Sequence, residues 1–511
     1  MMNDAEKSDV PIVATKLVNA SGPPGGEQAE RRGAAEGNTV HINTRRAQKR
    51  ASVSQGLERV RQAARDRKEE KFTTLLHHID VAALRTAYAG LRRDAAVGVD
   101  GTTWQEYGKG LEGRLVDLHE RVHRGSFRAQ PSRRTYIAKA DGRQRPLGIA
   151  ALEDKIVQSA VVKVLNVIYE EDFLGFSYGF RPGRSQHDAL DALAVGIARR
   201  RVNWILDADI RAFFDTVSHD WLLRFIERRI GDPRILRLIR KWLNAGVLED
   251  GVWKESTEGT PQGAVISPLL ANIYLHYVLD TWAQDWRKSG VKGDMIIVRY
   301  ADDVVVGFQH QVEAERFLAA LRERMEQHSL ALHPDKTRLI EFGRYAAERR
   351  WKRGLGKPET FNFRGFTHIA GRDRRGAFQL KRITRRDRRQ LRLQAIKDGL
   401  KRLWHAPVAE QGRWLGQVVG GYLNYHAVPT NLNTLRGFLG GVRRLWWQAL
   451  RRRGQKDRTS WAELDRLAKR WLPSLSVLHP WPELRFDRRH PRWEPGAVVP
   501  LAGFCAGGAQ Q

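Results

Sequence analysis

The sequence predicts an α+β fold followed by a separate α-helical region. Three observations predict this fold. NWILDADI at 203–210 has the pattern of an apolar strand, and MIIVRYADDVVVGF at 295–308 has the pattern of a hydrophobic hairpin, and both lie among helical segments. The third is the change beyond about residue 375, where apolar residues keep helical spacing and Arg and Trp become frequent. Because 511 residues exceed one compact core, two or three domains are expected.

The N-terminal part begins without any pattern of secondary structure. Residues 1–54 mix Gly, Pro, Ala and charges, and we expect a flexible leader there. From about 55 to 130, apolar residues recur at spacings of three and four, which predicts Arg-rich amphipathic helices. RRTYIAKADGRQRPLGIA at 133–150 alternates apolar and polar residues around Asp141-Gly142, which predicts a basic β-hairpin.

The rest of the chain is predicted to be mainly helical. KIVQSAVVKVLNVIYEEDF at 155–173 has the pattern of a buried helix, and PLLANIYLHYVLDTWAQDW at 268–286 that of a long, mostly apolar one. Further helices are expected in RRDRRQLRLQAIKDGLKRLW, TLRGFLGGVRRLWWQALRRRG and SWAELDRLAKRWL. We therefore expect one domain at 55–372, a helical domain at 373–485 and an irregular, Pro-rich tail at 486–511.

The charge of the chain indicates its kind of partner. Lys and Arg number 88 against 58 Asp and Glu, a net charge of +30, which favours binding to a polyanion. Nucleic acid is the expected polyanion, with an anionic membrane surface as the alternative. No apolar run approaches the roughly 20 residues of a membrane-spanning helix, and the N-terminus lacks a secretory pattern, so an intracellular protein is expected. A lone Cys505 excludes zinc sites built on cysteine pairs.

Carboxylates occur where two predicted strands end. Asp207 and Asp209 lie in ILDADI, and Asp302 and Asp303 lie in RYADDVVV. Burying an ionised carboxylate costs several kcal/mol unless a cation or hydrogen bonds compensate. A hard divalent ion such as Mg²⁺ compensates converging carboxylates well.

The alternative is that these acids pair with the adjacent arginines, Arg211 and Arg299. For either segment alone the two interpretations are equally good. Taken together, the two acidic segments favour a pair of Mg²⁺ ions that supports in-line phosphoryl transfer, as a polymerase requires.

Tyr300-Ala301-Asp302-Asp303 matches the YxDD box of reverse transcriptases, and further blocks follow the order of that family: AKADGRQRPLGIA, GFSYGFRPGRSQHDAL, DADIRAFFDTVSHDWL, GTPQGAVISPLLANIYL, HPDKTRLIEFG and FNFRGFTHI. GFRPGRS and GTPQGAVISPLLANIYL resemble the group II intron-encoded reverse transcriptases and maturases in particular. The resemblance covers roughly residues 75–485. Because the cysteine pairs of the family's endonuclease are missing, the chain resembles the endonuclease-lacking bacterial type, and we expect no cleavage of the second target strand.

The resemblance implies a right-hand polymerase fold. Fingers and palm, an antiparallel sheet plus helices, would occupy 55–372, and an α-helical thumb or maturase domain 373–485. The implied function is RNA-directed DNA polymerisation, together with binding of intron RNA to promote splicing and mobility. Two Mg²⁺ ions are the implied cofactors. The implied partners are group II intron RNA, an RNA template with a DNA primer, dNTPs and target DNA, in a cytoplasmic, nucleoid-associated ribonucleoprotein.

The resemblance also assigns residues to the reaction. The catalytic residues would be Asp209, Asp302, Asp303 and Lys336, and the lysine resembles the one that the family is proposed to use to protonate leaving pyrophosphate. The metal ligands would be Asp209, Asp302, Asp303 and the backbone carbonyl of Ile210. The nucleotide would contact Lys139, Arg145, Phe214 and Gln262, with the Phe214 ring crowding a ribose 2′-hydroxyl. For Lys336 an ordinary surface lysine is the alternative, and for Lys139 and Arg145 general attraction to phosphates.

Arginines on the hairpin and on the C-terminal helices are the candidate contacts to nucleic acid. They are Arg133, Arg134, Arg443, Arg444, Arg451 and Arg452. Tryptophans are interleaved with the C-terminal arginines at positions 404, 446, 447 and 461, and we expect at least half of these four to fill the core.

Two other functions are compatible with the same residues. One is a splicing cofactor without polymerase activity, which the intact acids argue against. The other is a bacterial reverse transcriptase outside an intron. The long helical block with GYLNYH argues against the retron, diversity-generating and defence types, and a free-standing or host-adopted enzyme stays open.

Overall fold

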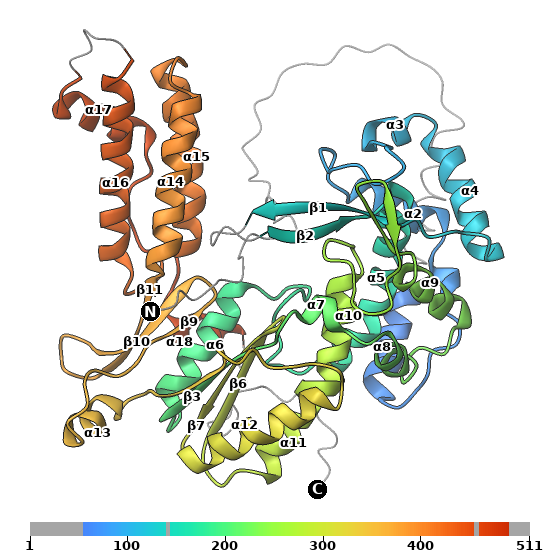
Figure 1. Cartoon of the computed structure of the whole chain (residues 1–511), viewed down its shortest axis with the longest axis horizontal. Helices are drawn as coiled ribbons and strands as arrows, with labels where there is room; N and C mark the ends of the chain where they lie inside the picture. Colours follow the sequence, from blue (N-terminus) through green and yellow to red (C-terminus); the bar gives the residue numbers. More distant parts are fainter. Residues whose placement is uncertain (1–54, 139–143, 454–458, 490–511) are drawn as a thin grey trace, which may run out of the picture.

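A computed structural model describes residues 55–138, 144–453 and 459–489 of the chain. In these residues the strands form three sheets, and helices flank and connect them, which confirms the predicted α+β class (Figure 1). The expected leader at 1–54 lies outside the described residues.

The central sheet has the strand order β6-β7-β3-β8, and every neighbouring pair is antiparallel. The strands are β3 Trp204–Asp209, β6 Met295–Tyr300, β7 Asp303–Phe308 and β8 Arg338–Glu341. Alternate residues of a strand face opposite sides, and Ile205 and Leu206 accordingly pack into different core clusters. Helix α6 (Gln186–Arg199) covers one face and α12 (Gln311–Glu326) the other. Both predicted strand segments are confirmed.

The two long apolar helices were also predicted correctly. The first is α5, Leu152–Asp172. The second is continuous but changes its winding: α10 (Ser267–Leu275) passes into a π-helical turn, His276–Asp280, and then into α11 (Thr281–Ser289). π-helical turns inside α-helices occur frequently at functional sites.

A second sheet, with the order β2-β1-β4-β5, carries the predicted hairpin. Its strands are β1 Ser132–Ala138, β2 Gln144–Ile149, β4 Val247–Glu249 and β5 Val252–Lys254. β1 and β2 are antiparallel, whereas β1 and β4 are parallel. The hairpin is confirmed, and its tip at Asp141-Gly142 lies outside the described residues.

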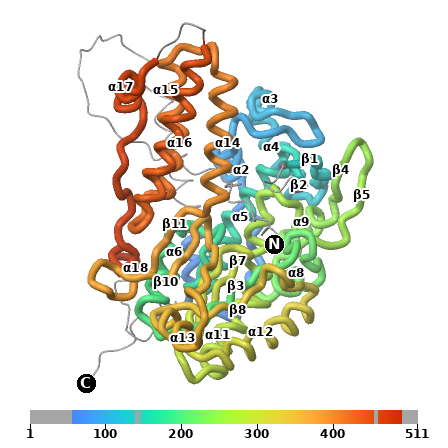
Figure 2. Tube along the Cα trace, turned by 60° about the vertical axis from the view of Figure 1, so that its left-hand side comes forward, coloured from blue at the N-terminus to red at the C-terminus, as the bar shows by residue number. Residues whose placement is uncertain are grey.

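The C-terminal region consists of a small sheet and a helical bundle. The sheet, in the order β11-β10-β9, contains β9 Phe361–Phe363, β10 Phe366–Arg372 and β11 Phe378–Thr384. The bundle contains α14 Arg386–Arg402, α15 Val408–His426, α16 Leu432–Arg451 and α17 Trp461–Trp471. Helices α14, α15 and α16 run side by side in both views (Figures 1 and 2) and enclose a hydrophobic cluster of their own. The predicted Arg- and Trp-rich helices are thus confirmed.

The described residues contain further helices. They are residues 55–66, α2 Val81–Ala89, α3 Trp104–Gly108, α4 Leu111–Arg124, α7 Phe213–Thr216, α8 His219–Ile226, α9 Pro233–Leu243 and α13 Ala346–Lys352. Within the described ranges, no helix combines the length and the apolar character that crossing a bilayer requires.

The expectation of an irregular tail is wrong at its start. Pro482–Arg489 form helix α18, which packs against α6. Phe486 is buried, Asp487 pairs with Arg199 at 2.7 Å, and Arg485 pairs with Asp191 at 3.1 Å. Proline is compatible with the first turn of a helix, and these tertiary contacts stabilise a segment whose composition suggested a loop.

Candidate active site

The register of two strands brings the predicted acids to one end of the central sheet. Asp209, the last residue of β3, pairs directly with Asp303, the first residue of β7. Directly opposed residues of antiparallel strands project to the same face. Asp302 precedes Asp303 in the two-residue turn between β6 and β7, and all three acids are half-buried. The structure therefore brings together the acids that were predicted to act together.

The turn that carries Asp302 has an unusual backbone and a close neighbour. Ala301 has φ 56°, in the left-handed region that favours Gly. The backbone of Gly179 lies against it so closely that any Cβ on Gly179 would overlap the Ala301 nitrogen. Tyr178 N also donates to Arg299 O at 2.8 Å. The GFSYGF segment thus flanks the hairpin, and Gly179 is a site residue that the sequence reasoning missed.

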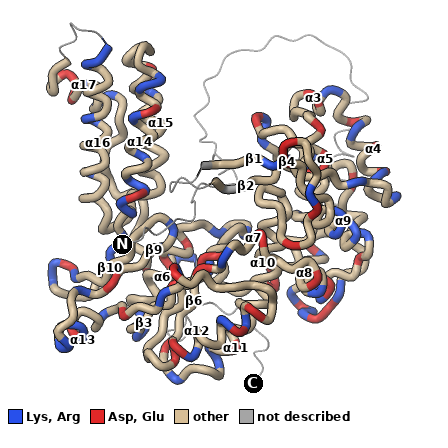
Figure 3. The backbone as a smooth tube through the Cα atoms, in the orientation of Figure 1, with Lys and Arg blue, Asp and Glu red and all other residues tan. Residues whose placement is uncertain are grey.

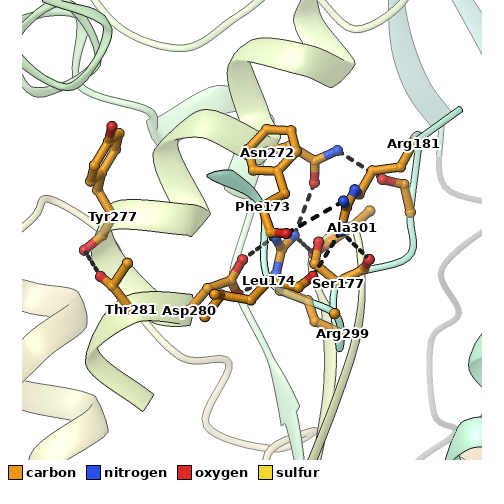
Figure 4. Close-up of polar contacts among 12 residues, drawn as sticks. Phe173, Leu174, Ser177, Arg181, Asn272, Tyr277, Asp280, Thr281, Arg299 and Ala301 are labelled. Atoms are coloured by element: carbon orange, nitrogen blue, oxygen red, sulfur yellow. Dashed lines mark hydrogen bonds and ion pairs between the residues drawn. The ribbon is translucent and has the colours of Figure 1, made fainter. Parts of the chain in front are cut away.

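A buried ion pair stabilises the same turn. Arg299 donates to Asp280 through Nε at 2.7 Å and Nη2 at 2.5 Å, and both side chains are fully buried. Arg299 Nη1 also donates to Asn272 Oδ1 at 3.0 Å and to the Ala301 carbonyl at 2.9 Å (Figure 4). Arg299 therefore does not pair with Asp302 or Asp303, and that alternative is wrong for this arginine.

This network was missed at the sequence level, although a signal was present. Asp280 and Arg299 each interrupt an apolar run, and a buried charge needs a partner. Asn272 completes the arrangement by donating to the Gly179 carbonyl at 2.7 Å, which links helix α10 to the glycine beside the turn. The predicted catalytic hairpin is thus held by the long apolar helix.

The HPDKT segment lies along the end of β3. Lys336 Nζ is 3.8 Å from Asp209 Oδ2, and His333 N donates to the Asp209 carbonyl at 2.7 Å. Ile210 forms a β-bridge with Leu332. Lys336 and Ile210, two of the predicted site residues, therefore flank Asp209.

An arginine that the sequence analysis did not assign contacts Asp303. Arg364, in the turn between β9 and β10, donates through Nη1 to Asp303 Oδ2 at 2.9 Å. Its guanidinium also lies over the Tyr300 ring, 4.1 Å from the ring centroid. An acid of the box does pair with an arginine, but with one that is distant in sequence.

The predicted nucleotide contacts come from helix α7, from the loop before α10 and from the β1–β2 hairpin. Phe214, in α7, is half-buried, and its carbonyl accepts from Thr260 N at 2.7 Å. The Gln262 carbonyl accepts from Gly148 N of β2 at 2.6 Å. Lys139 lies outside the described residues. The backbone of Arg145, in β2, pairs with that of Ile137, in β1.

The arginines predicted to bind nucleic acid differ in their surroundings. Arg133 donates to the Val97 carbonyl at 3.1 and 2.8 Å and so holds an internal loop, whereas Arg134 is half-buried in the same strand. Arg443 forms an ion pair with Asp465. Of the other three, Arg451 lies over the Trp447 ring at 4.8 Å, and Arg444 and Arg452 are exposed.

Two of the four tryptophans pack into the bundle core, as expected. Trp446 is fully buried and donates to Gln411 Oε1 at 3.1 Å, and Trp447 packs against the same cluster. Trp461 is 49% exposed and stacks on Trp447 with ring centroids 4.8 Å apart. Lys and Arg occur on these helices and on the helices of the fingers side (Figure 3).

The donor chemistry at Asp209 and Asp302 fits Mg²⁺. In the described part of the chain, no three His, Cys, Asp or Glu side chains form a group that could hold a metal ion by themselves. Mg²⁺ characteristically takes one or two protein carboxylates and completes its octahedron with water and substrate phosphates. Two carboxylates at the end of adjoining strands therefore match its needs in a ternary complex.

Known proteins resemble part of this chain. Residues 137–368 match the family described as reverse transcriptase (RNA-dependent DNA polymerase). Protein YkfC of Escherichia coli (strain K12) is 36% identical over 275 residues, which are 47% of this chain and 71% of YkfC.

Intron-encoded proteins are among the relatives. Group II intron-encoded protein LtrA of Lactococcus lactis subsp. cremoris is 36% identical over 43% of this chain and 37% of LtrA. An uncharacterized 91 kDa protein in the cob intron of Schizosaccharomyces pombe is 42% identical over 32% of this chain and 21% of that protein. The match thus spans most of YkfC but well under half of the other two proteins.

Proposed function

This chain belongs to the group II intron-encoded reverse transcriptases, a family of RNA-directed DNA polymerases and maturases, and we propose that Asp209 and Asp302 form its polymerase centre. The observation that carries the proposal is the register of β3 and β7, which pairs Asp209 with Asp303 and sets Asp302 in the adjoining turn. Two carboxylates at one end of a sheet suit phosphoryl transfer that is driven by positioning and charge.

In this proposal the carboxylates of Asp209 and Asp302, with the carbonyl of Ile210, would hold two Mg²⁺ ions, and Asp303 would be the weaker third acid beside them. Mg²⁺ would supply charge stabilisation at the triphosphate and favour loss of the proton from the primer 3′-hydroxyl. Lys336, whose Nζ lies 3.8 Å from Asp209 Oδ2, would donate a proton to departing pyrophosphate.

The substrate contacts follow from the same assignment. Lys139 and Arg145 bind the triphosphate, because paired cations neutralise its charge and Arg offers a forked contact. The Phe214 ring excludes a ribose 2′-hydroxyl, and Gln262 contacts the incoming base pair. Gln262 is tied to β2 by the hydrogen bond from Gly148 N, and Thr260 N donates to the Phe214 carbonyl, so both contacts would move with the hairpin.

The proposed partners are an RNA template with a DNA primer, dNTPs, group II intron RNA and target DNA. The exposed Arg444 and Arg452, with Arg134 on β1, are available to phosphates, whereas Arg133 and Arg443 have protein partners as well. We infer a ribonucleoprotein with intron RNA, associated with the nucleoid in a bacterial cytoplasm, by analogy with LtrA as an intron-encoded protein of a bacterium.

The decisive experiment is extension of a DNA primer on an RNA template with Mg²⁺. The wild-type chain should extend it, EDTA should stop extension, and Asp302→Asn should abolish extension while intron RNA is still bound. Asp220→Asn, which removes one exposed carboxylate from α8, is the matched control and should stay active. Undiminished extension by Asp302→Asn would exclude the assigned centre.

The same variant separates polymerisation from splicing. If intron RNA splices equally well with the wild-type and Asp302→Asn proteins, the maturase function does not depend on the carboxylates. A wild-type protein that supports splicing but never extends a primer would instead be a splicing cofactor without polymerase activity.

A further inference from the structure

We propose that Arg364 is a positioning residue for polymerisation: it holds Tyr300 and Asp303 from the β9–β10 turn and connects the acidic hairpin to helix α15 of the bundle. The inference rests on the proposed polymerase centre. In this inference Asp303 lies beside Asp302 and also anchors the hairpin, because its carboxylate forms an ion pair with Arg364.

The side chain of Arg364 makes an ion pair with Asp303 and stacks on the Tyr300 ring. Its Nη1 donates to Asp303 Oδ2 at 2.9 Å, and its side chain is 10% exposed while that of Asp303 is 23% exposed. The flat guanidinium lies 4.1 Å from the centroid of the Tyr300 ring, which is the stacking that arginine permits and lysine does not. One side chain thus contacts the residues before and after the Ala301-Asp302 turn.

Arg364 has a backbone conformation that arginine does not favour. Phe363 and Phe366 pair at the end of the hairpin, so Arg364 and Gly365 form its two-residue turn, with φ 45° and 79°. A turn with positive φ at both positions favours Asn-Gly or Asp-Gly, because other side chains are strained there. A strained arginine whose side chain reaches the acids is best explained by the contacts that it makes.

The same turn is tied to the bundle. Tyr425, on α15, donates its hydroxyl to the Arg364 carbonyl at 2.8 Å, and its ring lies 5.7 Å from that of Phe366. Arg364 therefore contacts α15 through its backbone and the hairpin through its side chain. A shift of α15 would be transmitted to Tyr300 and Asp303 through Arg364.

The test compares three variants in the full chain. Arg364→Asn removes the guanidinium but suits the left-handed backbone, and Arg364→Lys keeps the charge but loses the planar stack. Arg374→Asn removes an exposed charge from the β10–β11 turn and is the matched control. For each, we would measure single-turnover extension at increasing dNTP, the Kd for primer–template in EDTA, and the unfolding temperature in EDTA.

Arg364→Asn should lower the extension rate at saturating dNTP by about 100-fold, the size of effect that a misplaced reacting group produces. Its Kd for primer–template in EDTA should match that of Arg374→Asn, and Arg364→Lys should recover part of the rate. If Arg364→Asn does not fold, Arg364→Lys decides: a reduced rate with an unchanged Kd supports the proposal, and a wild-type rate overturns it.

A double-mutant cycle tests the contact itself. If Arg364 acts through Asp303, then Asp303→Asn combined with Arg364→Asn should be no slower than the slower single variant, and the unfolding temperatures in EDTA should be non-additive too. Rate losses that multiply would overturn the inference. If the wild type and Arg374→Asn extend primers and Arg364→Asn equals them, only this inference fails; if the wild type never extends a primer, the proposed function fails with it.

Discussion

Asp209, Asp302 and Asp303 lie at the surface end of a sheet rather than in its interior. The side chains of Asp209 and Asp303 are 14% and 23% exposed, and each has a protein cation within 4 Å: Lys336 and Arg364, respectively. Their charge is thus compensated within the protein before substrate binds. In the proposed centre, a Mg²⁺ ion at Asp209 would therefore compete with the Lys336 ammonium for the carboxylate. A lysine released in this way would be available to the leaving group.

We expect Phe214→Ala to weaken the choice of deoxynucleotides over ribonucleotides. Phe214 is half-buried against the main core, so its ring is held in place, and its removal would open room for a 2′-hydroxyl. The ratio of kcat/KM for dNTP over rNTP should fall by about 10- to 100-fold, the range that a single hydroxyl commands in an apolar pocket. An unchanged ratio, with dNTP extension intact, would remove Phe214 from the sugar contact.

At the scale of elements, the long apolar helix determines where the acidic turn lies. Its π-helical turn ends at Asp280, which pairs with Arg299 of β6, and Arg299 in turn donates to the Ala301 carbonyl. The helix therefore supports stability and site geometry through the same pair. Because both charges are fully buried, loss of one partner leaves the other without compensation.

Asp280→Ala should accordingly lower the free energy of unfolding by about 3–5 kcal/mol, the usual cost of breaking a buried ion pair. Asp285→Ala, which removes an exposed acid from α11 of the same helix, should change it by less than about 0.5 kcal/mol. Urea unfolding in EDTA measures both values. Equal stabilities of the two variants would contradict the role of the pair.

Buried histidines at the junction of α6, β10 and the bundle predict a pH dependence. Burial lowers the pKa of His368 to about 3 and that of His187 to about 2. Both are neutral in the folded protein at neutral pH, while in the unfolded chain they titrate near 6.5. Their contribution to stability is therefore complete above pH 6.5 and is lost as the pH falls below it, by about 1.4 kcal/mol per pH unit for each histidine.

His368→Phe removes the contribution of one histidine to the pH dependence of stability. The new phenyl ring can keep the stack on Phe361, whose ring centroid lies 4.8 Å from that of His368. Between pH 6.5 and 5, its free energy of unfolding should fall less steeply than that of the wild type, as measured by urea unfolding in EDTA. Identical slopes would show that His368 takes up a proton in the folded state.

At the scale of the whole molecule, the net charge of +30 governs binding to nucleic acid. Each phosphate that the protein neutralises releases counterions, so the Kd for a primer–template should rise steeply with salt. Replacing Arg444 and Arg452 by Gln should reduce the slope of log K against log salt by about 1 for each residue. Arg374→Gln should leave the slope unchanged, and a salt-independent Kd would contradict binding through phosphates.

The sequence by itself determined the class of the fold, the strands around the acids, the basic hairpin, and the helices rich in Arg and Trp. Those features follow from the period of apolar residues and from turn residues, which act between near neighbours and are visible in any short window. The resemblance added Lys336, and the structure brings it to Asp209. The hairpin tip with Lys139 remains a prediction.

Only the tertiary structure decided which charged side chains form pairs. Arg299 pairs with Asp280 at a separation of 19 residues, Arg364 with Asp303 at 61, and Thr337 contacts Asp209 at 128. It also decided that Gly179 lies against the acidic turn and that Pro482–Arg489 form a helix on α6. Electrostatic and steric contacts depend on distance in space, and the local pattern that reveals a strand carries no information about the segment that folds against it.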